Sequence, residues 1–316
     1  MNAPSEPAKL SVVMPTYQCR KLMEQHLGPM KTWADLADEI VVVDSRSTDG
    51  TVELIRAELR HPKLRIIQRG KGLYASWNEG VAATSGRWVY ISTAGETITR
   101  QHLLTMLKKG ESAKADVIIS PCDFVDEEGR PKPGVRKNPG IYSELAAQGD
   151  VLIAPPAVRY FAFRSAGTHA LLGSCASELF RGDFLRARPF PEDYGTHGDT
   201  AWLLRHAHEM RLCVLQSVGS TFCLHQPSFP ETKEARRLVL DRMHAKEIAA
   251  GGITPVLTSS IRLRGLMGRR KVAWKGLASA LVWASANVSY MRAKLEHQKL
   301  EAEEMRRLKG LIMPVQ

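Results

Sequence analysis

Apolar and polar positions follow a regular rhythm along the first 120 residues. Short runs rich in Val and Ile stand at 10–14, 39–44, 63–67, 87–92 and 115–120. Stretches with the apolar spacing of helices lie between them, at 20–34, 49–60, 73–84 and 99–110. Strands that alternate with helices are typical of a parallel sheet covered on both faces, with ligands bound at the carboxyl ends of its strands. We therefore predict an α/β fold.

The rhythm changes after residue 120. A polar loop rich in Pro and Gly occupies 127–140, and 151–165 has the pattern of an irregular strand. We expect a helix from about Asp199, a strand at 211–216, and charged helical segments from Thr232 onward.

These patterns predict a domain over 1–230 followed by a C-terminal helical extension over 231–316. A length of 316 residues suits one large domain or two moderate ones.

The chain carries a net charge of +11, which indicates an anionic partner. From Val256 to Gln316 there are 12 Lys and Arg against 4 Asp and Glu, so most of the excess belongs to the extension. The nearly balanced body and the absence of a recognition motif argue against nucleic-acid binding.

The five cysteines form no CxxC pair, which argues against a zinc site and against a disulfide framework. The N-terminus has no apolar run of the signal-peptide kind, and no stretch of about 18 apolar residues predicts a membrane span. We expect a cytoplasmic, reduced protein.

Two motifs follow the first two predicted strands. Pro15-Thr16-Tyr17 ends the first, which is also the pattern of a plain strand-to-helix turn. The run VVVDSRSTDGT at 41–51 places Asp44 at the tip of the second. Helix capping accounts for the polar residues after it. Capping does not explain Asp44, a carboxylate suited to accept hydrogen bonds from a base or ribose.

Together with GLYASWNEGVAATSGRWVYIS at 72–92, these motifs resemble the family 2 glycosyltransferases of the GT-A fold, over residues 10 to about 226. The resemblance implies a mostly parallel sheet flanked by helices, and a nucleotide-sugar site. It also implies a nucleotide-binding half at about 10–120 and an acceptor half at about 121–230. The residues that it assigns to the base and ribose are Pro15, Thr16, Tyr17 and Asp44. Arg46 stands at the third place of the family's Asp-Asp/Ser-Gly-Ser-Thr-Asp-Gly-Thr run, where Arg is less familiar.

The loop Arg69-Gly70-Lys71-Gly72 follows the third predicted strand. It offers two cations and flexible backbone N–H groups to a diphosphate. A solvated basic turn is an equally good interpretation.

The resemblance also implies a divalent metal, Mg²⁺ or Mn²⁺, held on the diphosphate by an Asp-x-Asp motif after the fourth strand. This chain has Thr93-Ala94-Gly95-Glu96 there, so Ala94 and Gly95 are expected beside the donor and Glu96 as the metal ligand. His225 is the second candidate ligand, and an imidazole would favour Mn²⁺. A metal-independent enzyme and a degenerate site stay open.

Residues 173–207 resemble the part of the family that carries the catalytic base. The motif Gly-Glu-Asp aligns with Asp199, with Gly198 at the place of the usual Glu. Asp199 precedes an apolar helical run, and a helix N-terminus favours an ionised carboxylate. A simple N-cap is the alternative role for Asp199, and Glu192 and Asp193 are secondary candidates for the base.

The expected reaction is inverting transfer of a sugar from a nucleoside diphosphate sugar, UDP-linked by family frequency, to a hydroxyl of a glycan or lipid-linked acceptor. The basic, Trp-bearing stretch at 261–291 suits an anionic membrane surface, which would make the protein peripheral on the inner face of the membrane. Packing on the catalytic domain or in a homodimer is the other interpretation of these helices.

Three alternative functions fit parts of this sequence. A degenerate GT-A-like protein would bind nucleotide or glycan without turnover. A nucleotidyltransferase would use a similar sheet. A dehydrogenase is disfavoured because no GxGxxG follows the first strand.

Overall fold

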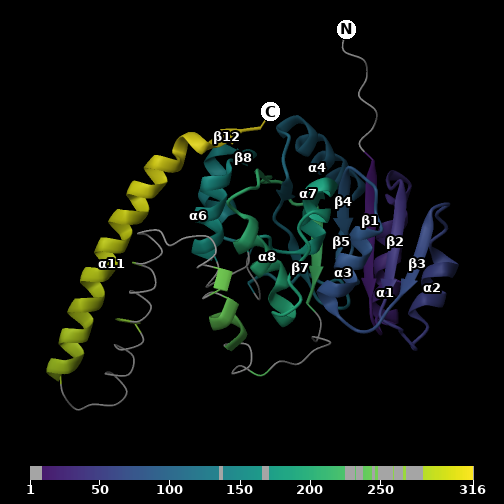
Figure 1. The fold of residues 1–316 in the computed structure, drawn as a ribbon, viewed down its shortest axis with the longest axis horizontal. Helices are drawn as coiled ribbons and strands as arrows, with labels where there is room; N and C mark the ends of the chain where they lie inside the picture. Colours follow the sequence, from purple (N-terminus) through teal and green to yellow (C-terminus); the bar gives the residue numbers. More distant parts are fainter. Residues whose placement is uncertain are drawn as a thin grey trace, which may run out of the picture.

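A nine-stranded sheet runs through the molecule, with helices on both faces (Figure 1). Its strand order is β12-β8-β10-β6-β9-β4-β1-β2-β3. The computed structural model describes residues 9–134, 138–165, 171–224, 232, 238–243, 246–247, 259, 266–267 and 280–315, with 280–287 described by their backbone alone.

The strands are β1 Leu10–Thr16, β2 Glu39–Asp44, β3 Leu64–Gln68, β4 Trp88–Ile91, β5 Thr97–Ile98, β6 Val117–Ile119, β7 Asp123–Val125, β8 Val151–Ile153, β9 Glu178–Arg181, β10 Leu212–Val214, β11 Ser220–Cys223 and β12 Ile312–Pro314. The α-helices are α1 Arg20–Lys31, α2 Thr51–Glu58, α3 Leu73–Ala82, α4 Arg100–Ala113, α5 Ile141–Leu145, α6 Pro155–Ser165, α7 Gly182–Arg186, α8 Gly198–His206 and α11 Ala280–Leu308. Short 3₁₀ turns are η1 Ala34–Leu36, η2 Ala146–Gln148, η3 Cys175–Ser177, η4 Gly195–His197 and η5 Lys309–Leu311.

One half of the main sheet is parallel and the other is mixed. β1 pairs in parallel with β2 and β4, and β2 with β3. In the other half β9 lies antiparallel between β4 and β6, and β8 is antiparallel to β10. The chain order reverses at β1, whose neighbours are β2 and β4, and such a reversal is where open α/β sheets bind ligands. The predicted α/β sheet is confirmed.

Alternate residues of β1 enter two different cores. Leu10, Val12 and Met14 pack with α1, α2 and α4 on one face, whereas Val13 packs with α3 on the other. Successive side chains of a strand point to opposite faces, so a strand covered on both sides has to be apolar throughout. This is why β1 and β2 are mostly apolar in the sequence.

A second, smaller sheet has three strands in the order β5-β11-β7. β5 begins directly after Glu96 and pairs antiparallel with β11. The Thr97 and Thr221 hydroxyls share a hydrogen bond of 2.6 Å across this pair. The small sheet therefore fixes the loop after β4 against a segment that is distant in sequence.

The C-terminal part of the chain returns to the main sheet. Helix α11 confirms the predicted helical C-terminus and lies at the outer side of the molecule, drawn in yellow in Figure 1. β12 follows it and adds an antiparallel edge strand to β8, with Ile312 opposite Ile153. The boundary between a 1–230 domain and a 231–316 extension stays a prediction, but the extension supplies a strand to the domain's own sheet.

The expectation of an irregular strand over 151–165 is wrong for most of its length. Strand β8 ends at Ile153, and helix α6 begins at Pro155. Proline is well tolerated in the first turn of a helix, because the N–H that it lacks has no partner there. Val158 and Phe161 then bury an apolar face in the core that also holds α8.

Within the described parts of the chain, no helix is both long and apolar enough to cross a membrane. The five cysteines are free thiols in the structure.

Candidate functional site

A pocket of about 170 Å³ opens at the carboxyl ends of the parallel strands. Its walls come from the ends of β1, β2 and β4, from the first turn of α3, and from α1. The lining residues are Pro15, Thr16, Tyr17, Cys19, Leu22, Ser45, Lys71, Gly72, Leu73, Ser76, Thr93, Ala94 and Glu96. Segments up to 81 positions apart in sequence thus meet at the edge where the sheet topology places a ligand.

The pocket brings together most of the residues that the sequence assigned to the donor. The predicted residues that line it are Pro15, Thr16, Tyr17, Lys71, Gly72, Ala94 and Glu96. Three others, Asp44, Arg69 and Gly95, do not line it. Sequence reasoning missed Ser45 and Ser76, whose hydroxyls lie 3.2 Å apart in the pocket wall.

Asp44 organises the loop that follows β2. Its side chain is fully buried. Oδ1 accepts hydrogen bonds from the Thr16 hydroxyl at 2.9 Å and from the Ser47 hydroxyl at 2.6 Å, and Oδ2 accepts from the Ser47 N–H at 2.8 Å. Asp44 therefore joins the ends of β1 and β2 behind the pocket wall, and its role toward a ligand stays a prediction.

The two cations of the predicted diphosphate loop point in different directions. Lys71 lies over the Tyr17 ring, with its Nζ 4.3 Å from the ring centroid, and lines the pocket. Arg69 forms an ion pair with Glu79 of α3, at 3.4 Å. Gly72 is the N-cap residue of α3, so the free N–H groups at the start of this helix lie at the pocket. Lys71 and this helix N-terminus together make the wall electropositive.

Glu96 is a buried pocket residue with two hydrogen-bond donors of its own. Its Oε2 accepts from the Ser174 hydroxyl at 2.6 Å and from the Ala176 N–H at 2.9 Å. Gly95 before it adopts φ +84, which a side chain would strain, and a Cβ there would stand 3.2 Å from the Cys223 Cβ. The loop after β4 is thus tied by Glu96 to the turn that leads into β9.

Asp199 begins helix α8, as predicted, and is partly buried. Its Oδ1 accepts from the Thr200 N–H at 2.6 Å. Burial raises the pKa of Asp199 above its usual value, and hydrogen bonds from Thr200 and Tyr74 and the charge of His197 lower it in part. A carboxylate with a raised pKa is a better proton acceptor, as a general base requires.

Asp199 does not line the pocket, and its charge acts on two other titratable groups, Cys175 and Glu178. Burial raises the pKa of the Cys175 thiol well above its usual range, and the carboxylates of Glu96, Glu178 and Asp199 add to it. Thr93 of the pocket wall also interacts with this thiol. Glu178 is 3% exposed, and burial raises its pKa well above the usual range. Sequence reasoning missed Glu178. The signal that could have found it is a charged residue at the start of an apolar strand.

Glu192 and Asp193, the secondary candidates for the base, do not line the pocket. Glu192 and Asp193 are both exposed. Glu192 accepts a hydrogen bond from Asn78 at 3.1 Å, and Asp193 pairs with Lys246 at 3.6 Å.

Among the described residues, Glu96 is the carboxylate that a metal ion at the pocket would find. Nowhere in these segments do three His, Cys, Asp or Glu side chains gather as ligands of one ion. Glu96 offers one carboxylate, one oxygen of which already has two donors. His225 lies outside the described residues, so its part in a metal site stays a prediction.

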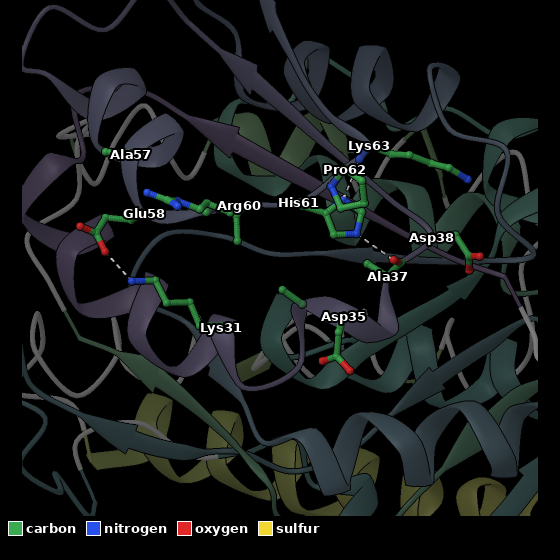
Figure 2. Close-up of a pocket in the computed structure, with 12 residues that line it drawn as sticks. Lys31, Asp35, Ala37, Asp38, Ala57, Glu58, Arg60, His61, Pro62 and Lys63 are labelled. Atoms are coloured by element: carbon green, nitrogen blue, oxygen red, sulfur yellow. Dashed lines mark hydrogen bonds and ion pairs between the residues drawn. The ribbon is translucent and has the colours of Figure 1, made fainter.

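A larger hollow of about 760 Å³ lies at the opposite edge of the sheet, before β2 and β3 (Figure 2). Charges of both signs surround it. Figure 2 shows Lys31 paired with Glu58, and the His61 ring bonded to the Ala37 carbonyl oxygen at 3.0 Å. It contains none of the predicted site residues, and we assign the chemistry to the smaller pocket because the motifs converge there.

Comparisons with solved structures support the fold. The fold is similar to that of TarS from S. aureus, residues 1–349, in a complex with UDP-GlcNAc. The TM-score is 0.60 at 18% identity, over 90% of this chain and 81% of that one. The full TarS chain matches with a TM-score of 0.58, over 49% of its length. At this identity the likeness shows the fold, which is the expected GT-A-like α/β fold.

Two curated proteins share local sequence similarity. The succinoglycan biosynthesis protein ExoO of Rhizobium meliloti is 32% identical over 94 residues, 29% of this chain and 27% of that protein. The glycosyltransferase GlyA of Streptococcus pneumoniae is 30% identical over 124 residues, 38% of this chain and 18% of that protein. The match thus spans about a quarter or less of either relative.

The family model for glycosyl transferase family 2 matches residues 11–170. These residues contain β1 to β4, the pocket walls formed by them, and the loop that carries Glu96. With half of the sequence matched and the donor-side motifs assembled in one pocket, the chain belongs to glycosyl transferase family 2.

Proposed function

We propose that the protein is an inverting glycosyltransferase that moves a sugar from a nucleoside diphosphate sugar to an acceptor hydroxyl. The observation that carries this proposal is the pocket at the carboxyl edge. Motifs from the ends of β1 and β4 and from the start of α3 line it. We propose a UDP-linked donor because the similar TarS structure is a complex with UDP-GlcNAc.

In the proposed mechanism Asp199 is the general base. It takes the proton of the acceptor hydroxyl as the acceptor oxygen attacks the anomeric carbon, and the nucleoside diphosphate leaves with the electron pair of the broken bond. Lys71 and the N-terminus of α3 are suited to balance the charge that develops on the leaving diphosphate. One carboxylate base is sufficient for an inverting displacement.

The divalent metal stays a prediction, and no step of the mechanism is derived through it. If Mn²⁺ or Mg²⁺ takes part, Glu96 is the described residue nearest to the predicted place, and the ion would neutralise charge on the diphosphate. Such a role would compete with the hydrogen bonds that Glu96 accepts from the β9 turn.

For the acceptor we propose a glycan or a lipid-linked glycan of an extracellular polysaccharide or envelope pathway. The support is the name of the ExoO relative, which takes part in succinoglycan biosynthesis. We also propose peripheral association with an anionic membrane through 261–291, supported by the basic and Trp-bearing sequence of that stretch. Most of this stretch lies outside the described residues, and a homodimer through the same segment is the competing outcome.

Calorimetric titration with UDP, GDP and dTDP, each with and without Mn²⁺, tests the donor site. We expect one nucleotide to bind, and Lys71→Ala to weaken that binding by about tenfold through the loss of one charge-assisted contact. Lys108→Ala removes a cation from α4, away from the pocket, and serves as the matched control.

Binding that requires Mn²⁺ would support the predicted metal. Binding of the same strength without it would place charge neutralisation on Lys71 and α3. No binding of any nucleotide would contradict the proposed transferase. Asp199→Asn should bind nucleotide normally and lose transfer, because it keeps the shape but not the base.

A further inference from the structure

One buried carboxylate is bonded to both sides of the segment that carries Asp199. Glu247 is 1% exposed, and its Oε1 accepts hydrogen bonds of 2.7 Å from the Tyr194 hydroxyl and from Nη2 of Arg205. Its Oε2 accepts a third, of 3.0 Å, from Nε of Arg205. Tyr194 stands five positions before Asp199, and Arg205 stands six positions after it. Both ends of this segment are therefore held by the same side chain.

The backbone between Tyr194 and Arg205 changes direction close to Asp199. The turn η4 ends directly before α8, and Gly195 at its start adopts φ 56, a left-handed conformation. Glycines at 195 and 198 give this backbone more conformational freedom than other residues would. The Asp199 carboxylate therefore needs contacts with other elements to stay in one place.

Glu247 comes from the part of the chain that we expected to be the C-terminal extension. Residues 238–243 and 246–247 are helical. Arg242 donates a hydrogen bond to the Asp193 carbonyl oxygen, and its guanidinium lies over the Tyr194 ring, 5.5 Å from the centroid. The beginning of the extension thus packs against the segment that leads into α8.

The Glu247 carboxylate is ionised in this position. Burial raises its pKa, but the hydrogen bonds from Arg205 and Tyr194 outweigh this effect, so the pKa lies below its usual value. A carboxylate and a guanidinium joined by two parallel hydrogen bonds form a strong pair with a fixed relative orientation. The pair therefore fixes the orientation of α8 as well as stabilising the fold.

We propose that Glu247 is a positioning residue that holds Asp199 at the place from which it accepts the acceptor's proton. This inference rests on the proposed function of Asp199. Six residues of helix, about 9 Å, separate Arg205 from Asp199, so Glu247 acts through the backbone and takes no part in the proton transfer. The beginning of the extension then belongs to the transferase site, although it follows the residues that the family model matches.

Glu247→Gln tests the inference with two measurements on the full chain. The first is hydrogen–deuterium exchange, read by mass spectrometry in peptides that span 193–201. The second is the release of UDP from UDP-glucose, UDP-galactose and UDP-GlcNAc, with water as the acceptor. We expect exchange to become about tenfold faster in these peptides and to stay unchanged in β1 to β4. We expect kcat to fall about 10- to 100-fold, as for a misplaced catalytic group, with an unchanged KM for the donor.

Glu209→Gln is the matched control. Glu209 accepts a hydrogen bond of 2.7 Å from Nη2 of Arg188, and its Oε1 lies 2.7 Å from Nδ1 of His206. It therefore also holds α8, but at the end of the helix that is distant from Asp199. Because this pair is partly exposed, we expect exchange in 193–201 and kcat to stay within about twofold of wild type.

Tyr194→Phe covers the case in which Glu247→Gln does not fold, since neutralising one partner of a buried ion pair is strongly destabilising. It removes one hydrogen bond and leaves the ion pair between Glu247 and Arg205 in place. We expect the same local rise in exchange and a kcat lowered by about threefold or more. Faster exchange with an unchanged kcat, in either variant, would mean that Glu247 stabilises the fold without positioning the base, and would overturn the inference.

Failure of the inference differs from failure of the proposed function. If wild type and Asp199→Asn release UDP equally, Asp199 is not the base and the proposed function fails, whatever the exchange shows. If Asp199→Asn is inactive but Glu247→Gln keeps the kcat of wild type, the transferase stands and the role of Glu247 is wrong. A kcat lowered by Glu247→Gln and not by Glu209→Gln, at unchanged KM, supports the inference.

Discussion

The Glu96 carboxylate accepts a hydrogen bond of 2.6 Å from the Ser174 hydroxyl, 78 positions further along the chain. This bond, with a second one from the Ala176 N–H, holds the loop after β4 against the turn before β9. The residue at the predicted metal position is therefore also a structural bridge between the donor side and the base side of the site.

Glu96→Gln tests the structural role. An amide offers one acceptor oxygen in place of two and adds a buried donor, so we expect a loss of about 1–3 kcal/mol in the free energy of unfolding, measured with urea in the absence of metal. Glu79→Gln is the control, because Glu79 forms an exposed pair with Arg69 that should contribute less than about 1 kcal/mol. If Glu96→Gln changes the Mn²⁺ dependence of nucleotide binding but leaves the free energy of unfolding without metal unchanged, the hydrogen bonds of Glu96 do not stabilise the fold.

Arg46 occupies the third place of the second-strand motif with φ 57, a left-handed conformation that favours glycine. The same geometry explains why glycine is usual at this place in the family. We expect Arg46→Gly to raise the free energy of unfolding by up to about 1 kcal/mol, since it relieves this strain.

Lys114 is the matched control for Arg46. It has φ 51 at the end of α4, away from the pocket. The midpoint temperature of thermal unfolding should rise in both glycine variants. UDP titration separates them if the Arg46 side chain contributes to the site, because only Arg46→Gly would then bind more weakly. A decrease in stability of both variants would contradict the strain argument.

His26 makes stability depend on pH. Its ring is 1% exposed and bonded to the Ser92 hydroxyl at 2.9 Å, and burial lowers its pKa from 6.5 to about 4. Between these values the unfolded chain binds a proton that the folded protein does not. Stability is therefore fully present above pH 6.5 and falls as the pH drops toward 4, by about 3 kcal/mol in total.

The measurement for His26 is urea unfolding at pH 7 and pH 5, in wild type and His26→Gln. The variant should be less stable at pH 7 but lose less on going to pH 5. His102, bonded to Ser120 at 2.8 Å with its pKa also lowered by burial, should retain a slope of the same sign. Equal losses in both proteins would show that His26 does not carry the effect.

The edge strand β12 gives a test with an internal control. Ile312 is 8% exposed and lies opposite Ile153, whereas its neighbour Met313 is 43% exposed. We expect Ile312→Asp to lower the unfolding free energy by about 2 kcal/mol or more, and Met313→Asp by less than about 0.5 kcal/mol. Similar effects at both positions would mean that β12 is not packed on the sheet.

The parallel half of the fold was predictable because its signals are local. The apolar runs at β1 to β4 and the helices between them were found within a few residues of their observed ends. In contrast, β12 has only three residues and follows a long helix. It is a strand only because it pairs with β8. The helix at 155–165 was missed because its apolar face is short and begins with two prolines.

The donor side of the candidate site could be predicted because its motifs stand at strand ends. The residues around Asp199 could not be predicted, because they come together through contacts between distant segments. Tyr74 lies within the run at 72–92, but no spacing rule connects it with Asp199, 125 positions later. Glu178 begins β9, and no local signal predicts that this strand pairs with β6.

The pairing of Ile153 with Ile312 also sets the order in which the sheet assembles. These residues are about 160 positions apart, so closing the loop between them costs more entropy than any pairing among β1 to β4. The parallel half can form early, while β8 keeps an open edge until the distant segment arrives. Unpaired strand edges associate with other chains. A protein with this connectivity should therefore aggregate more readily during refolding than in its native state.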